Sequence, residues 1–313
     1  MAHESLIDEL FAGSVRALAK LISIVEDRDE GYRDVIDAVY GATGASYRVG
    51  ITGPPGAGKS TLVSGLAQRY RQMESSVGIL ASDPTSPFSG GALLGDRVRM
   101  HDLAGDPGVF IRSLATRGGL GGLSRVTHEV SLLLEAAGYE TLLYETVGVG
   151  QAEIDVVRAA DSVGVVVTPQ SGDAVQALKA GLMEIADLFV VNKADQEGAD
   201  RAAQALQVAL RHAEGGWTTP IVKTVASQVD GLERLQNVLD KHYASLGEEG
   251  IHQRRRTRLA TMIQTAVEEA FRQELWNDEG QRRLEHACEQ VHAGERGPFA
   301  AARALRAELD QPR

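Results

Sequence analysis

The stretch GPPGAGKST, from Gly53 to Thr61, constrains the fold of this chain more than any other part of its sequence. It fits the pattern G-x-x-x-x-G-K-[ST], follows the β-branched run RVGIT directly, and opens a stretch of helical length. A strand, a glycine-rich turn and a helix in this order place several backbone N–H groups at the start of the helix, where they can meet an anion. The sequence therefore predicts a phosphate-binding loop.

Short aliphatic runs recur after Arg48 and alternate with amphipathic stretches of helical length. The runs are RVGIT, SVGILAS, GVFIRS, TLLYE, SVGVVVT, LFVVN and PIVKT. Both faces of these strands are apolar, which is typical of strands covered on both sides. The alternation predicts an α/β fold of the P-loop NTPase type, with a mostly parallel sheet flanked by helices.

Helical patterns stand at both ends of the chain. Residues 5–26 repeat apolar side chains at intervals of three and four, which predicts one helix, and a second short helix is expected over residues 31–41. After about residue 250 the same spacing predicts two or three further helices. They must bury their apolar stripes against the main domain or against another copy of the chain, and the sequence leaves both open.

Composition excludes several classes of protein. The chain has 313 residues, 43% of them hydrophobic, and no apolar run long enough to span a bilayer. Its net charge of −11 argues against nucleic acid as a partner, and the basic run from Arg254 to Arg256 is better explained as a solvated helix face. A single cysteine, Cys288, cannot form an internal disulfide or a cysteine-rich metal site. We expect a cytoplasmic protein without a membrane partner.

The phosphate-binding loop supplies the first candidate site residues. Lys59 is expected to meet the β and γ phosphates of a nucleotide, and the hydroxyl of Ser60 to face Mg²⁺. The candidate nucleotide-binding residues here are Gly53, Pro54, Pro55, Gly56, Ala57, Gly58, Lys59, Ser60 and Thr61.

The stretch NKAD, from Asn192 to Asp195, ends the strand LFVV and can read guanine. In this interpretation the Asp195 carboxylate accepts hydrogen bonds from the ring N–H and the exocyclic amine, while the stem of Lys193 lies along the ring. Adenine lacks this pair of donors. Two such bonds favour guanine by about a hundredfold.

Acidic residues at strand ends are candidates for holding the metal. Asp83 ends the strand SVGILAS, and Asp96 lies in the loop of about a dozen residues that follows. In the stretch ETVGVGQ, Glu145 takes the place of the usual aspartate of guanine-nucleotide switches, and Gly148 that of the glycine whose N–H meets the γ phosphate. Val149 stands where Ras-like proteins carry the glutamine that positions water. Slow hydrolysis is therefore expected until a partner completes the site.

With these motifs together, the chain resembles the MeaB/ArgK or methylmalonic aciduria type A family of P-loop GTPases, which are chaperones of adenosylcobalamin-dependent acyl-CoA mutases. The resemblance covers nearly the whole chain. It rests on GITGPPGAGKST, SDPTSPFSGGALLGDRVRM, ETVGVGQ, TPQSGDAVQALKAGLMEIAD and VVNKAD. The wording departs from the commoner family pattern at Gln170, Ser171 and the pair Ala81-Ser82.

The resemblance implies a homodimer whose GTP cycle gates adenosylcobalamin delivery from an adenosyltransferase to a mutase and protects or reactivates that mutase. It also implies roles for residues at matching positions. Lys59 and Ser60 would hold phosphate and Mg²⁺, and Asp83, Asp96 and Glu145 would organise the metal and the attacking water. Asn192, Lys193 and Asp195 would read guanine, and Ala226 or Ser227 would close over the base. Asp173 and Lys179 would couple nucleotide state to the mutase.

The expected domains follow from the same resemblance. They are an N-terminal helical extension at residues 1–45, a G domain at residues 46–248 and a C-terminal helical dimerisation arm at residues 249–313. Two alternatives remain open. A GTPase for nickel or other metal insertion would need clustered Cys or His ligands, and a small-molecule kinase linked to amino-acid transport would use ATP.

Overall fold

The computed structural model describes residues 3–83, 103, 105–115, 126–146, 159–169, 182–210 and 217–309. Of Asp83, Ala115, Glu308 and Leu309 it describes the backbone alone. The chain forms two compact units, Met1–His252 and Gln253–Arg313. Each unit is described by itself.

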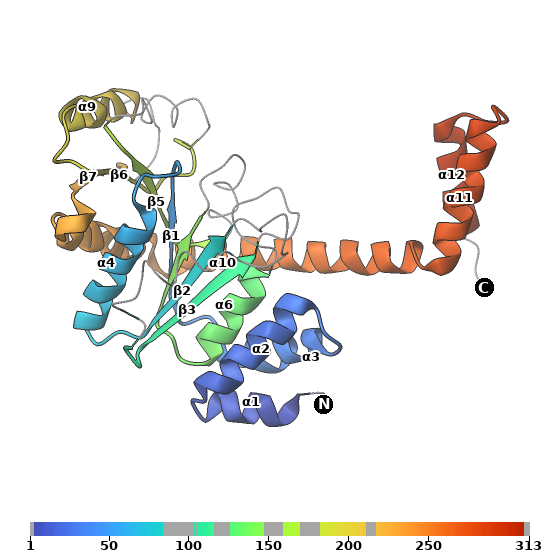
Figure 1. The fold of residues 1–313 in the computed structure, drawn as a ribbon, viewed down its shortest axis with the longest axis horizontal. Coiled ribbons are helices and arrows are strands. Elements are labelled where there is room, and N and C mark those ends of the chain that lie inside the picture. Colours follow the sequence, from blue (N-terminus) through green and yellow to red (C-terminus); the bar gives the residue numbers. More distant parts are fainter. Residues whose placement is uncertain are drawn as a thin grey trace. The chain divides into compact units, whose positions relative to one another are not determined.

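A seven-stranded sheet forms the centre of the first unit (Figure 1). The strands are β1 (Tyr47–Thr52), β2 (Val77–Asp83), β3 (Val109–Ala115), β4 (Thr141–Glu145), β5 (Ser162–Val167), β6 (Leu188–Asn192) and β7 (Ile221–Thr224). Their order is β3-β2-β4-β1-β5-β6-β7, and every neighbouring pair is parallel. Every residue of β1, β4, β5 and β6 is buried, as expected for strands covered on both faces. The predicted strands and the predicted parallel sheet are confirmed.

Helices cover both faces of this sheet. On one face, α4 (Lys59–Gln72) and the beginning of α10 (Leu232–Leu275) share a core with β1, in which Leu66, Leu235 and Val49 are buried. On the other face lies α6 (Thr127–Ala136), whose Ser131 accepts a hydrogen bond from the hydroxyl of Tyr144 on β4. Side chains alternate along a strand, so Leu143 of β4 joins the core with α4 while Tyr144 points the opposite way. Helix α9 (Ala199–Leu210) packs on β6 and β7.

The N-terminal segment forms three helices rather than the predicted two. They are α1 (Glu4–Phe11), α2 (Val15–Asp27) and α3 (Tyr32–Val39), and a 3-10 turn, η1 (Tyr40–Ala42), follows. The prediction of one helix over residues 5–26 was wrong. Gly13 has a φ of 86°, and the Ser14 hydroxyl accepts a hydrogen bond from the N–H of Ala17, so one helix ends and a capped one begins.

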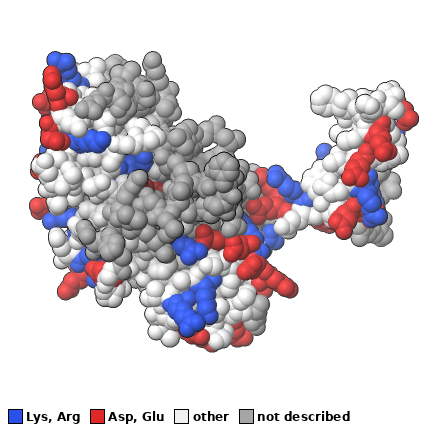
Figure 2. All heavy atoms as spheres, viewed as in Figure 1, with Lys and Arg blue, Asp and Glu red and all other residues white. Residues whose placement is uncertain are grey.

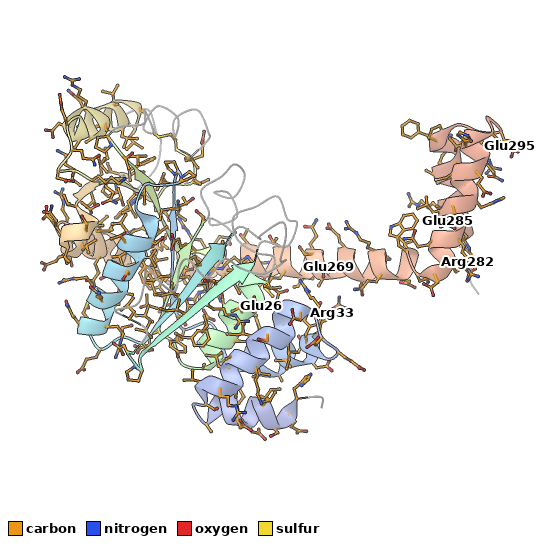
Figure 3. The ribbon with its side chains drawn as sticks, in the orientation of Figure 1. Glu26, Arg33, Glu269, Arg282, Glu285 and Glu295 are labelled. Carbon is orange, nitrogen blue, oxygen red and sulfur yellow. The ribbon has the colours of Figure 1, made fainter. Side chains whose placement is uncertain are left out.

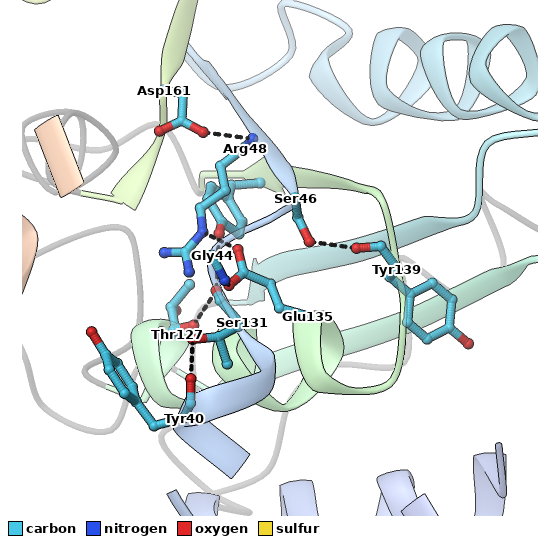
Figure 4. A network of polar contacts seen from close by, with 11 residues as sticks. Tyr40, Gly44, Ser46, Arg48, Thr127, Ser131, Glu135, Tyr139 and Asp161 are labelled. Atoms are coloured by element: carbon cyan, nitrogen blue, oxygen red, sulfur yellow. Dashed lines mark hydrogen bonds and ion pairs between the residues drawn. The ribbon is translucent and has the colours of Figure 1, made fainter. Parts of the chain in front are cut away.

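Two groups of polar contacts attach this segment to the sheet. Arg112 of β3 donates to the carboxylate of Glu26 on α2, which is labelled in Figure 3. Nearer the centre, the buried Arg48 guanidinium donates to Glu135 of α6 at 2.8 Å, and Glu135 also accepts from the backbone N–H of Gly44 (Figure 4). Although burial opposes the charge, nearby groups that include Glu135 raise the pKa of Arg48, so the guanidinium stays charged.

Helix α10 contains one irregular residue. Gly247 has a φ of 59° and a ψ of 179°, a backbone conformation that is almost confined to glycine. A Cβ atom placed there would meet nothing within 4 Å. The break is therefore a property of the backbone at Gly247 and not of crowding around it.

The second unit consists of the end of α10, α11 (Asp278–His292) and α12 (Pro298–Leu309). Helices α11 and α12 pack on each other and enclose an apolar groove of about 680 Å³, lined by residues that include Trp276, Leu284 and Leu305. The predicted C-terminal helices are confirmed. Across the residues that the structure describes, no helix has the length and hydrophobicity needed to span a membrane.

Candidate functional site

The predicted motifs gather at the carboxyl edge of the sheet. The phosphate-binding loop follows β1, Glu145 is the last residue of β4, Asn192 is the last residue of β6, and Ala226 follows β7. In an open parallel sheet this edge is where ligands collect. Segments that lie far apart in the sequence therefore meet at one site.

The phosphate-binding loop depends on its glycines for close approach to neighbouring atoms. Gly53 has a φ of 141°, and a Cβ atom on it would lie 2.1 Å from the carbonyl oxygen of Val166 on β5. Gly58 has a φ of 89°, and a Cβ atom there would lie 2.4 Å from Nδ2 of Asn192. A side chain at Gly53 would have to displace the backbone of β5, and one at Gly58 would have to displace the Asn192 amide.

Lys59 and Ser60 open helix α4 beside this loop. The buried Lys59 ammonium group donates to the carbonyl oxygens of Gly53, at 2.9 Å, and Pro54, at 3.0 Å. Gly58 caps the helix without a side-chain acceptor, so the first backbone N–H groups of α4 are not occupied by a capping side chain. A cationic side chain and a helix N-terminus thus lie together, which is the arrangement that favours a phosphate.

Glu145 lies against the start of this helix. Its Oε1 accepts a hydrogen bond from the Ser60 hydroxyl at 2.5 Å, and both side chains are buried. A hydroxyl and a carboxylate oxygen are hard ligands of the kind that Mg²⁺ prefers. Within the described ranges, no group of three His, Cys, Asp or Glu side chains could hold a metal ion by itself. The pair fits Mg²⁺ that is bound together with the phosphates of a nucleotide.

Asn192 connects three elements of the site. Its Nδ2 donates to the carbonyl oxygen of Ala57 at 2.8 Å, and its Oδ1 accepts from the Thr224 hydroxyl at 3.0 Å and from the N–H of Ala226 at 3.2 Å. The buried amide therefore holds the phosphate-binding loop, the end of β7 and the turn after β7 in one arrangement.

The rest of the predicted base-reading set surrounds Asn192. Lys193 is half-buried with a φ of 57°, and the N–H of Ala194 donates to the carbonyl oxygen of Thr224. Asp195 is exposed. In the 3-10 turn η3 (Ala226–Gln228), Ala226 is buried and Ser227 is exposed.

Several predicted site residues cannot be placed. Asp96, Gly148, Asp173 and Lys179 lie outside the described residues, and for Asp83 only the backbone at the end of β2 is described. The structure therefore brings together Lys59, Ser60, Glu145 and the NKAD residues at one edge of the sheet, and the roles of these and of the other five residues stay predictions.

Sequence reasoning missed three threonines at the same edge. Thr224 binds Asn192, and the hydroxyl of Thr146 donates to that of Thr52 at 2.9 Å. Each stands next to or within a motif already recognised: Thr52 precedes Gly53, Thr146 follows Glu145, and Thr224 lies in the stretch KTVAS. Their position beside a motif is the only feature of the sequence that could have suggested them.

Comparisons with known proteins show the family of this chain. The family model described as "Methylmalonyl Co-A mutase-associated GTPase MeaB" matches residues 18–280. A protein from Pyrococcus abyssi is 49% identical over 270 residues, which are 84% of this chain and 83% of its own length.

Two further matches cover most of the chain. The "Methylmalonic aciduria type A homolog, mitochondrial" of Caenorhabditis briggsae is 34% identical over 81% of this chain and 66% of its own length. A solved structure described as an LAO/AO transport system kinase is 26% identical, has a TM-score of 0.73, and covers 98% of this chain and 97% of its own.

Proposed function

Because the chain belongs to the MeaB family of methylmalonyl-CoA mutase-associated GTPases, we propose that its GTP cycle gates delivery of adenosylcobalamin to an acyl-CoA mutase and protects or reactivates that mutase. The observation that carries the nucleotide part is the convergence of Lys59, the Ser60–Glu145 pair and Asn192 on one edge of the sheet. The mutase part rests on the family, since its model is described as mutase-associated.

In this proposal the loop and Lys59 bind the β and γ phosphates. Lys59 would exchange its two carbonyl acceptors for phosphate oxygens, and the N-terminus of α4 would add partial positive charge. Ser60 and Glu145 would hold Mg²⁺, with Asp83 and Asp96 as further members of the set. The metal, when bound, would supply positive charge beside the phosphates. Gly148 would donate its N–H to the γ phosphate.

Guanine would be read beside Asn192. Asp195 would accept from the base, the stem of Lys193 would lie along it, and Ala226 or Ser227 would close over it. The buried Asn192 supports this role without touching the base, because it fixes the turn of Ala226 against the phosphate-binding loop.

Hydrolysis by the chain alone would be slow. Val149 is in the position of the glutamine that orients water in Ras-like GTPases, so a partner would complete the site. Asp173 and Lys179 would couple the nucleotide state to that partner. A cobalamin adenosyltransferase would be the second partner, and two copies of the chain would join through the C-terminal arm.

The two alternatives have less support. Metal insertion needs a Cys or His cluster, yet Cys288 is the one cysteine of the chain and the described part contains no such group. The solved structure described as a transport-system kinase favours a kinase only through its description. The NKAD motif argues against ATP as the nucleotide.

The test is GTP turnover with and without a cobalamin-dependent acyl-CoA mutase from the same organism. We expect slow GTP hydrolysis, no ATP hydrolysis, and stimulation of at least about tenfold by the mutase. Glu145→Gln should still bind GTP but turn it over slowly, and Lys59→Ala should lose tight binding. Turnover that the mutase does not change, with no co-purification of the two proteins, would reject the mutase as the partner.

A further inference from the structure

A pair of buried threonines lies where the two motif-bearing strands end. Thr52 is the last residue of β1 and Thr146 is the first residue after β4, and their side chains are 0% and 1% exposed. The Thr146 hydroxyl donates to Oγ1 of Thr52 at 2.9 Å. The last registered pair of these strands is Ile51 with Glu145, so the threonines meet one residue beyond it.

This contact joins the segments that carry the phosphate-binding loop and the carboxylate. Thr52 is bonded to Gly53, and Thr146 is bonded to Glu145. One backbone hydrogen bond accompanies the pair, from the N–H of Thr146 to the carbonyl oxygen of Ile51, and it is long at 3.3 Å. Strand ends open more readily than strand centres, so the hydroxyl contact is well placed to hold this end closed.

We propose that Thr52 and Thr146 are a positioning pair, which fixes the Glu145 carboxylate beside Ser60 and thereby sets how strongly Mg²⁺ tightens nucleotide binding. Glu145 meets Ser60 at 2.5 Å, and both are fixed by the chain segments that the threonines join. A shift of about 1 Å in a group that acts through fixed geometry changes its effect by one to two orders of magnitude. The inference rests on the proposed function, because it concerns how that site holds its metal.

The measurement is the affinity for a fluorescent GDP in Mg²⁺ and in EDTA. The ratio of the two dissociation constants gives the gain in nucleotide affinity from Mg²⁺, and it does not depend on catalysis. Thr146→Val keeps the shape of the side chain and removes its hydroxyl. We expect the gain to fall about tenfold while the dissociation constant in EDTA stays unchanged.

Companion variants make the result specific. Thr52→Val breaks the same bond from the other side and should lower the gain equally, and the double variant should lower it no further. Thr146→Ser restores a hydroxyl and should restore the gain. If Thr146→Val fails to fold, Thr52→Val alone still tests the pair.

Thr141→Val is the matched control. Thr141 begins the same strand at the opposite edge of the sheet, is buried, and shares a hydrogen bond with the Ser75 hydroxyl at 3.1 Å. It should lower the melting temperature and leave the Mg²⁺ gain unchanged.

An unchanged gain in Thr146→Val and Thr52→Val, or an equal fall in Thr141→Val, would overturn the proposal. A wild-type protein that binds no guanine nucleotide, or that gains nothing from Mg²⁺, would instead reject the proposed function.

Discussion

Asn192 and Asp195 lie three residues apart in one motif but have opposite surroundings. Asn192 is buried, and its amide is bonded to the loop before α4 and to the end of β7. Asp195 is exposed. A side chain already bonded within the protein can hold a pocket in shape, whereas an exposed carboxylate can meet a ligand. Substitutions at the two positions should therefore have different effects.

Asp195→Asn should change which base is preferred. The asparagine amide can donate to the additional carbonyl oxygen of xanthine, whereas the carboxylate accepts from the amine of guanine. We expect GTP affinity to fall about a hundredfold and xanthosine triphosphate to become the tighter ligand, in competition against a fluorescent nucleotide. Glu197→Gln removes an exposed carboxylate two residues away and should change neither. Undiminished preference for GTP in Asp195→Asn would contradict the base-reading role.

Asp240 of α10 should make stability depend on pH. Burial raises the pKa of this half-buried carboxyl group, although the hydrogen bond from the Tyr70 hydroxyl, at 2.9 Å, opposes the rise. A carboxyl group whose pKa is higher in the folded protein favours folding in its protonated form. Its contribution is complete below the unfolded pKa of about 4 and is lost as pH rises through the folded pKa.

Asp240→Asn should therefore stabilise the protein at pH 7. The gain should be about 0.5 kcal/mol, because solvent screens a half-buried group, and should disappear near pH 3. Urea unfolding at both pH values measures it. Asp37→Asn, at an exposed position of α3, is the control and should show no gain at either pH. An equal gain at pH 3 and pH 7 would show that charge is not its cause.

At the scale of elements, the strands could be predicted and one helix boundary could not. A parallel strand buried on both faces has an unbroken aliphatic sequence, and this pattern can be recognised without knowing which strands lie beside it. The apolar spacing of α1 and α2 continues across Gly13, so periodicity alone predicted one helix. Gly13 and Ser14 are the residues that end one helix and cap the next, but the sequence alone does not predict a backbone φ of 86° at Gly13.

Contacts between elements were the least predictable part of the site. The loop, Lys59 and Ser60 could be assigned because their spacing along the chain is itself the motif. The Thr52–Thr146 bond depends on the register of β1 against β4, and the Asn192–Thr224 bond on that of β6 against β7. Register comes from packing of the whole sheet, which no local pattern contains.

Gly247→Ala should convert α10 into an uninterrupted helix. The native φ and ψ of Gly247 cost alanine roughly 1–3 kcal/mol, while alanine favours the helical conformation by about 1 kcal/mol over glycine. Spin labels on cysteines at the exposed positions Asn237 and His252, with Cys288 replaced by serine, report the change.

A single narrow distance near 22 Å is expected for the alanine variant, from a rise of about 1.5 Å per residue. Gly250→Ala makes the same substitution three residues later, where no positive φ is present, and should leave the wild-type distribution unchanged. Identical distributions in Gly247→Ala and wild type would contradict the prediction.

At the scale of the whole molecule, charged side chains are spread over the surface, whereas three exposed apolar side chains line up along one helix. Figure 2 shows Lys and Arg side chains lying among Asp and Glu side chains on the described part of the face in view. In the second unit, by contrast, Ile263, Val267 and Phe271 are 64%, 48% and 60% exposed and recur every four residues along α10. Such a stripe in the proposed dimerisation arm is suited to burial against another protein surface.

Phe271→Glu should shift the proposed dimer to monomer. A carboxylate in the centre of a buried apolar stripe would lose its hydration without a partner. Size-exclusion chromatography with light scattering should show at least about a tenfold weaker dimer. Gln273→Glu adds the same charge at an exposed position of the same helix and should leave the mass unchanged. A wild-type monomer would reject the dimer itself.

The position of Leu232, Leu235 and Leu239 in the core decides where this chain can be shortened. Leu232 lies so close to Gly65 of α4 that a Cβ atom on Gly65 would be 2.4 Å from its Cδ1. A fragment that stops at residue 231 would expose the apolar side of α4 to solvent and should precipitate during expression. A fragment that stops at residue 247 keeps all three leucines, and is the form to choose for crystallisation or NMR of the first unit alone.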